Sequence, residues 1–96
     1  MTHQNYALLH LYISGRVQGV GFRFFTIHRA KRYGITGWVK NTYDGRVEIE
    51  AEGKTGDLRL FLEDVRPGPA SSHVSNIVEE WHEIGFPRYR SFNVSY

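Results

Sequence analysis

Apolar and polar residues alternate over Leu8–Ser14, and the alternate positions from Leu9 to Ile13 are all apolar. A period of two is typical of an extended chain, in which successive side chains point to opposite faces. This segment is therefore predicted to be a β-strand that packs one face against the core.

The pattern changes over Phe22–Tyr33, where apolar and small side chains fall on a stripe with helical spacing. We expect a helix there, ended by Gly34, because glycine commonly terminates helices. The stripe is not clean, since Phe24 and Ile27 fall on the other side of this helix.

A second pair of extended segments is predicted over Thr36–Thr42 and Arg46–Glu52. Between them, Asp44-Gly45 is typical of a tight β-hairpin turn. The later segment alternates apolar and charged residues, which favours a strand with one buried face.

The clearest helix is predicted over Gly56–Arg66, where large apolar residues recur at i, i+3, i+4 and i+7. Thr55 is expected to cap this helix, and a Pro-Gly-Pro run that starts at Pro67 is expected to end it. Further strands are predicted over Val74–Ile84 and, more briefly, over Ser91–Tyr96.

The predicted order is β-α-β-β-α-β with a short extra C-terminal strand. This order is typical of a ferredoxin-like, split βαβ α+β sandwich, in which two helices cover one face of a mostly antiparallel sheet. A right-handed first βαβ unit would make its two strands parallel. The loop after the first strand and Asn41, which ends the second, would then emerge at the same edge, where ligands of open sheets commonly bind.

Length and composition limit the function classes. A chain of 96 residues, 41% of them hydrophobic, predicts one globular domain over residues 1–96. The sequence has no apolar run of membrane-spanning length and no secretion signal, so we expect a cytoplasmic protein. The lack of cysteine excludes disulfides and thiolate chemistry. Residues 1–43 contain six Lys/Arg and no Asp or Glu, which should attract anions.

The segment Gly15–Gly21 has three glycines in seven positions, which is typical of a loop. The backbone N–H groups of such a loop, with those that start the next helix, can form a concavity that fits a phosphate. The G-x-x-x-G-x-G spacing is neither the dinucleotide-binding nor the P-loop pattern. On glycine spacing alone, a tight turn that binds nothing is an equal alternative.

Two side chains near this loop are candidate site residues. Arg23 would be the second residue of the first helix, and its guanidinium can reach back to the loop because helical side chains tilt toward the N-terminus. Asn41 could hold a water molecule with its neutral amide. From the residues alone, however, a role for Asn41 as an Asx-turn residue is favoured.

The other titratable residues are not predicted to form a site. The histidines lack any metal-ligand spacing, so no metal site is expected. Glu48, Glu50 and Glu52 alternate along one strand, which predicts a solvated sheet face rather than a catalytic pair.

Two long segments resemble the signatures of the acylphosphatase family. Residues 15–23, Gly-Arg-Val-Gln-Gly-Val-Gly-Phe-Arg, are similar to the family's loop G-x-V-Q-G-V-x-[FY]-R. Residues 37–48 resemble its second signature, G-[WY]-V-x-N-x-x-D-G-x-V-E. The Pro-Gly-Pro-Ala run after the second helix is also similar, so the resemblance extends over nearly the whole chain.

The resemblance implies an enzyme that hydrolyses the carboxyl–phosphate bond of acyl phosphates to a carboxylate and inorganic phosphate, with no cofactor and no metal. It also implies that Arg23 and the loop amides bind the phosphoryl group and that Asn41 orients the attacking water. The implied catalytic residues are Arg23 and Asn41, and the implied substrate-binding residues are Gly15, Arg16, Val17, Gln18, Gly19, Val20 and Arg23.

Two alternatives stay open. A nucleic-acid-binding module can use the same fold, and the basic first half of the chain would suit one. Against it, Arg46–Gly53 carries three glutamates where an RNA-recognition strand carries stacking aromatic residues. The resemblance would also fit a domain at the start of a larger carbamoyl-transfer protein. We expect instead a free-standing monomer that acts on a small-molecule acyl phosphate and binds neither nucleic acid nor membrane.

Overall fold

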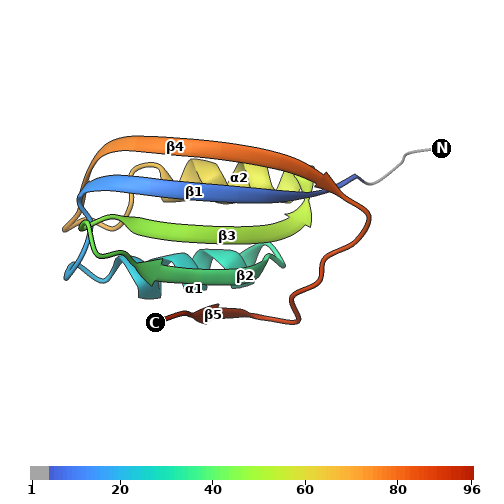
Figure 1. Ribbon diagram of the computed structural model, residues 1–96, viewed down its shortest axis with the longest axis horizontal. Helices are drawn as coiled ribbons and strands as arrows, with labels where there is room; N and C mark the ends of the chain where they lie inside the picture. Colours follow the sequence, from blue (N-terminus) through green and yellow to red (C-terminus); the bar gives the residue numbers. More distant parts are fainter. Residues whose placement is uncertain (1–4) are drawn as a thin grey trace.

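The computed structural model describes residues 5–96. In this part of the chain, strands and helices follow one another in the predicted order (Figure 1). Their bounds are β1 Tyr6–Arg16, α1 Phe22–Arg32, β2 Thr36–Asn41, β3 Val47–Lys54, α2 Thr55–Val65, β4 His73–Ile84 and β5 Phe92–Val94.

The strands form one five-stranded sheet with the order β4-β1-β3-β2-β5. β1 pairs antiparallel with β3 and β4, and β2 pairs antiparallel with β3. β1 and β2 therefore run in the same direction on either side of β3, as predicted. β5 lies at the edge of the sheet and pairs parallel with β2. Both helices lie on one face of the sheet (Figure 1), so the α+β, ferredoxin-like arrangement is confirmed.

The core lies between the helices and the sheet. The alternating residues of β1 that predicted a buried face, Leu9, Leu11 and Ile13, are all 0% exposed. The helices supply the opposite wall because each presents an apolar stripe at helical spacing. The buried residues of these stripes are Phe22, Thr26 and Ala30 in α1 and Leu58, Phe61, Leu62 and Val65 in α2.

Both helices are short. Each contains 11 residues, and across residues 5–96 no helix has the length and apolar character needed to cross a membrane. The ends of several elements differ slightly from the predictions: β1 extends two residues beyond the predicted Leu8–Ser14 at each end, and β5 covers only Phe92–Val94 of the predicted Ser91–Tyr96.

The prediction that Thr55 caps α2 is wrong. The N-cap is Lys54, which makes no side-chain cap hydrogen bond, and Thr55 is the first helical residue. The Thr55 hydroxyl donates instead to the backbone carbonyl oxygen of Asn5 at 3.1 Å, and its N–H donates to the same oxygen at 2.9 Å. Thr55 therefore ties the start of α2 to the chain that leads into β1.

The prediction of a solvated face for the glutamates of β3 is wrong for Glu52, which is 0% exposed. Its carboxylate accepts hydrogen bonds from the backbone N–H groups of Arg88 at 2.7 Å and Tyr89 at 3.2 Å. These two residues belong to the segment that joins β4 to β5. Burial of a carboxylate is costly unless it is hydrogen-bonded, so this pairing anchors the joining segment on the sheet.

The other two glutamates of β3 hold a histidine. His10 of β1 lies between them, with Nε2 2.7 Å from Glu48 and Nδ1 3.1 Å from Glu50. The Tyr89 hydroxyl donates to Glu50 as well. All three acidic side chains of β3 therefore have partners from other elements, which the pattern of a single strand does not reveal.

Candidate active site

A small cavity lies where the loop between β1 and α1 meets the end of β2. Its volume is about 100 Å³, which is room for roughly three water molecules at ~30 Å³ each. The two candidate side chains of the sequence analysis, Arg23 and Asn41, both line this cavity. They come together because β1 and β2 run in the same direction. Its lining consists of Val17, Gly19, Gly21, Phe22, Arg23, Phe24 and Asn41.

The start of α1 leaves its backbone N–H groups open. Gly21 is the N-cap, in the left-handed conformation (φ 81°) that glycine adopts readily, and no side chain caps the helix. The first turn contains no acidic residue. In the described part of the chain, the N–H groups from Val17 to Phe24 donate to no protein acceptor. Free donors at the positive end of a helix dipole favour an anion.

Arg23 is the second residue of α1, as predicted, and is half-buried. Within residues 5–96 its guanidinium forms no ion pair with a carboxylate. Its Cζ lies 5.9 Å from the centroid of the Tyr96 ring, a cation–π contact. The guanidinium is therefore positioned by an aromatic ring while its N–H groups are not engaged by an acidic side chain.

Asn41 is the last residue of β2 and is half-buried. The Asx-turn interpretation is not borne out, because the side chain of Asn41 makes no hydrogen bond with the described residues. Thr42 stabilises the turn instead: its hydroxyl oxygen accepts from the N–H of Arg46 at 3.1 Å, and its hydroxyl donates to Asp44. The carboxamide of Asn41 is thus available to a ligand or a water molecule.

The turn between β2 and β3 is braced around Asp44. The hydrogen bond from the Thr42 hydroxyl, helped by the N–H and guanidinium of Arg46, lowers the pKa of Asp44. The Nε of Arg46 lies 2.8 Å from this carboxylate, and its Cζ lies 4.5 Å from the Tyr12 ring centroid. These contacts fix the turn that follows Asn41.

Gln18 connects this turn to the β1–α1 loop. Its side-chain amide donates to the carbonyl oxygens of Thr42 and Arg46, both at 2.9 Å. The side chain therefore braces the two segments that form the cavity and does not itself line it. The sequence placed Gln18 in the loop but carried no signal for this partner.

Gly15 and Arg16 belong to β1 and lie outside the cavity lining. Gly15 (φ 124°) sits at an irregularity in the pairing of β1 with β4, and a Cβ there would lie 2.1 Å from the carbonyl oxygen of His73. Glycine is thus required at position 15 for a close backbone approach. Arg16 ends the strand and is exposed.

The valines of the loop face the core. Val17 is 1% exposed and Val20 packs against the core cluster, although Val17 also contributes to the cavity wall and Val20 does not. Gly19 lines the cavity as well. Of the predicted substrate-binding residues, the cavity lining therefore includes Val17, Gly19 and Arg23 and does not include Gly15, Arg16, Gln18 or Val20.

Phe24 is a residue of the cavity lining that the predicted site lacked. Its side chain is 80% exposed, outside the buried stripe of α1. The signal that could have found it is the irregular stripe itself, since a large apolar residue off the buried face stands directly beside the glycine-rich loop.

Comparison with known proteins identifies the family of this chain. A family model described as Acylphosphatase matches residues 9–94. The chain belongs to the acylphosphatase family. It is similar to the acylphosphatase of Bacillus velezensis, with 49% identity over 88 residues that make up 91% of this chain and 96% of that protein. The enzyme class expected from the two motifs is confirmed, and the substrate of such an acylphosphatase is a small-molecule acyl phosphate.

Solved structures of acylphosphatases share the fold. The crystal structure of the acylphosphatase from Bacillus subtilis matches with a TM-score of 0.88 and 39% identity, over 94% of this chain and 99% of that chain. Full-length HypF matches with a TM-score of 0.83 and 29% identity, over 98% of this chain but only 12% of that chain. An acylphosphatase fold is therefore also found within a larger protein.

The donor set of this acylphosphatase cavity suits an anion. Its polar lining is a guanidinium, a carboxamide and backbone amides, with no carboxylate, imidazole or thiolate. Across residues 5–96, no cluster of three or more His, Cys, Asp or Glu could hold a metal ion. Donors of this kind bind phosphoryl oxygens, whereas protein sites for Zn²⁺ are built from His, Cys or carboxylate ligands, and those for Ca²⁺ and Mg²⁺ usually include carboxylates.

Proposed function

We propose that the guanidinium of Arg23 and the free N–H groups of the β1–α1 loop hold the phosphoryl group of an acyl phosphate, and that Asn41 orients the water that attacks it. One observation carries this proposal: a single cavity contains Arg23, Asn41 and the unpartnered amides at the start of α1. Each hydrogen bond to a charged group is worth roughly 1.5–3 kcal/mol. Several such bonds suffice to bind a small dianion.

The reaction needs positioning and charge stabilisation more than proton transfer. The water oxygen attacks phosphorus, the bond between phosphorus and the carboxyl oxygen breaks, and its electron pair leaves with the carboxylate. A carboxylate is a weakly basic leaving group and needs no general acid. The proton of the water passes to a phosphate oxygen. Donors aimed at the equatorial oxygens stabilise the charge that develops there.

This mechanism requires no metal or other cofactor, because Arg23 and the helix start supply the positive charge that a cation would otherwise provide. The absence of acidic side chains from the cavity lining supports it, since a cation beside Arg23 would be repelled without a carboxylate to hold it.

Residues 1–96 would form one acylphosphatase-like domain that acts as a monomer in the cytoplasm and does not bind nucleic acid. The last point is supported by the open sheet face, where RNA-recognition domains of this fold stack bases. In this chain that face carries Glu48 and Glu50 around His10, and two carboxylates disfavour a polyanion. Sedimentation at several concentrations and salt-dependent RNA retention test these points.

The decisive experiment measures hydrolysis of benzoyl phosphate in the presence of EDTA. It compares wild type with Arg23→Ala and Asn41→Ala, and the matched controls are Arg32→Ala, an exposed arginine at the end of α1, and Asn76→Ala, an exposed asparagine of β4. Asn41→Ala should lower kcat by at least ~10²–10³-fold, as loss of one preorganised donor does. Arg23→Ala should weaken inhibition by inorganic phosphate and lower turnover together.

The controls should stay within twofold of wild type, and EDTA should have no effect. Full activity of either site variant would refute the role assigned to that residue. Loss of wild-type activity under EDTA that zinc or magnesium restores would refute the metal-free mechanism.

A further inference from the structure

We propose that Phe24 contacts the acyl group of the substrate and makes the enzyme favour aromatic and other bulky apolar acyl phosphates over acetyl phosphate. This inference rests on the proposed function, because it takes the phosphoryl group to lie beside Arg23 and Asn41.

The cavity is small and open on one side, with a volume of about 100 Å³. In the proposed mode of binding, the phosphoryl group and the attacking water would occupy most of it. The carboxyl carbon and its substituent must therefore extend through the mouth of the cavity. The side chains at the mouth decide which substituents are bound favourably.

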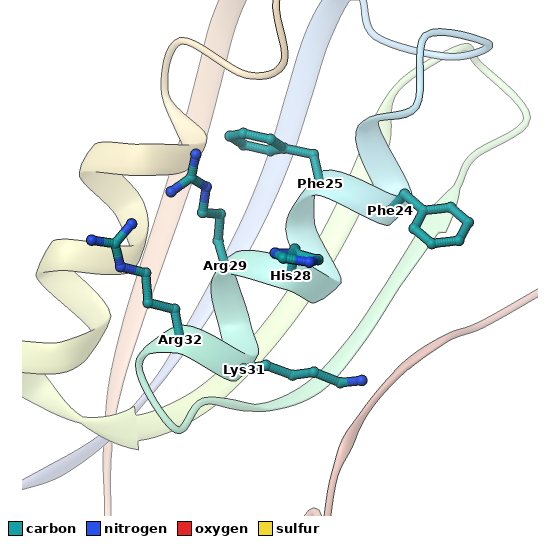
Figure 2. A pocket seen from close by; sticks show the side chains of 6 residues that line it. All are labelled: Phe24, Phe25, His28, Arg29, Lys31 and Arg32. Atoms are coloured by element: carbon teal, nitrogen blue, oxygen red, sulfur yellow. The ribbon is translucent and has the colours of Figure 1, made fainter.

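Phe24 lies at this mouth. As the third residue of α1, its side chain tilts toward the start of the helix and hence toward the cavity. It lines the small cavity and also a hollow of about 790 Å³ along the outer side of α1. Figure 2 shows its ring projecting from the first turn of the helix in a direction different from that of Phe25.

The ring of Phe24 has no other evident role. Its side chain is 80% exposed and does not belong to the core. The other ring of the hollow, Phe25, packs edge-to-face with the core residue Phe22, with 6.1 Å between centroids. It is also covered by Arg29, whose Cζ lies 5.0 Å from its centroid. Phe24 therefore offers the open apolar contact at the mouth.

The contact depends on the size of the acyl group. A benzoyl ring can pack against Phe24 and remove water from both surfaces, and aromatic pairs gain from such packing. The methyl group of acetyl phosphate covers little of the ring, and inorganic phosphate has no apolar group to pack against it. Beyond Phe24 the hollow is wide and lined by His28, Lys31 and Arg32 among others, so it excludes no acyl group by size.

The test measures kcat/KM for benzoyl phosphate and for acetyl phosphate, and the inhibition constant of inorganic phosphate. The variants are Phe24→Ala and Phe24→Leu, and the matched control is Phe86→Ala, a 71% exposed phenylalanine between β4 and β5. Because Phe24 is exposed, its replacement should leave the fold intact. Thermal unfolding of each variant verifies this.

Phe24→Ala should lower kcat/KM for benzoyl phosphate by roughly 3- to 10-fold and that for acetyl phosphate by less than twofold, with the phosphate inhibition constant unchanged. Phe24→Leu should be intermediate, and Phe86→Ala should resemble wild type. Suppose that Arg23→Ala weakens phosphate inhibition as expected. An equal effect of Phe24→Ala on both substrates, or no effect on either, would then overturn the inference and leave the proposed phosphoryl site standing. If Arg23→Ala leaves phosphate inhibition unchanged, the proposed phosphoryl site itself fails and the inference fails with it.

Discussion

The side-chain nitrogen of Gln18 lies 2.9 Å from the backbone carbonyl oxygen of Thr42, and this hydrogen bond joins the β1–α1 loop to the β2–β3 turn. A second bond of the same length reaches the carbonyl oxygen of Arg46. Because Asn41 directly precedes Thr42, these bonds set the separation between the loop amides and the Asn41 carboxamide. Gln18 is therefore a positioning residue for the proposed reaction.

Replacement of Gln18 should impair catalysis more than folding. Gln18→Glu keeps the shape of the side chain but removes both donors, each worth about 0.5–1.5 kcal/mol. We expect kcat to fall by roughly 10-fold or more, because small misplacements of catalytic groups are costly. Steady-state kinetics with benzoyl phosphate would check this, and a change in KM alone would contradict a positioning role.

Glu52 should stabilise the fold without acting in catalysis. Removal of its carboxylate by Glu52→Ala takes away the acceptor of the partly buried N–H groups of Arg88 and Tyr89. We expect the free energy of unfolding to fall by about 2–4 kcal/mol. Urea denaturation provides the measurement, and the exposed Glu63→Ala should change the result by less than about 0.5 kcal/mol. Equal stability of the two variants would show that Glu52 does not anchor the segment between β4 and β5.

Tyr33 predicts a dependence of stability on alkaline pH. Its hydroxyl donates to Asp64 at 2.8 Å, and this hydrogen bond, together with burial, raises the pKa of Tyr33. A raised pKa in the folded state means that the stabilisation is fully present below the unfolded pKa of about 10 and is lost as pH rises through the folded pKa.

The stability difference between wild type and Tyr33→Phe should therefore be largest near neutral pH and should shrink above pH ~10. Chemical denaturation at a series of pH values measures it. The exposed Tyr96→Phe serves as the control, and a constant difference for Tyr33→Phe up to pH ~11.5 would contradict the role of the hydrogen bond to Asp64.

Alanine substitutions at Gly15 and Gly56 should have opposite effects on stability. Gly15→Ala places a Cβ against the carbonyl oxygen of His73 at a positive φ, so it should destabilise the fold and disturb the start of the adjacent loop. Gly56 lies in α2 with no atom near an added Cβ, and Gly56→Ala should stabilise by roughly 0.5–1 kcal/mol. Thermal unfolding of both variants would show opposite shifts, and shifts of the same sign would contradict this reading.

The order of elements was predictable because it depends on local periodicity. The alternation around Leu11 predicts a buried strand face, and the helical spacing around Phe61 predicts a buried helix face. Both residues are 0% exposed in the structure. Glu52 shows where this reasoning stops. Its alternation with apolar residues is typical of a solvated face, but its burial is decided by Arg88 and Tyr89, which are distant in the sequence.

The site was predictable in part for the same reason. Arg23 and Asn41 line one cavity because β1 and β2 run in the same direction, which follows from the order of elements. The contacts between side chains at this edge of the sheet do not follow from that order. Thr42 takes the turn role that sequence rules give equally well to Asn41, and only the fold distinguishes them. Phe24 is exposed, and only its position off the buried stripe of α1 could have singled it out.

Anion binding at the start of α1 would affect how the stability of this protein is measured. Within residues 5–96, no side chain caps the first turn of α1, which follows Gly21, and its N–H groups up to that of Phe24 donate to no protein acceptor. An oxyanion bound there would accept hydrogen bonds from them. Inorganic phosphate should then raise the melting temperature in proportion to the logarithm of its concentration above the dissociation constant. Sulfate or phosphate in the buffer would raise the melting temperatures of destabilised variants. The stabilities of variants should therefore be compared in buffers without these anions.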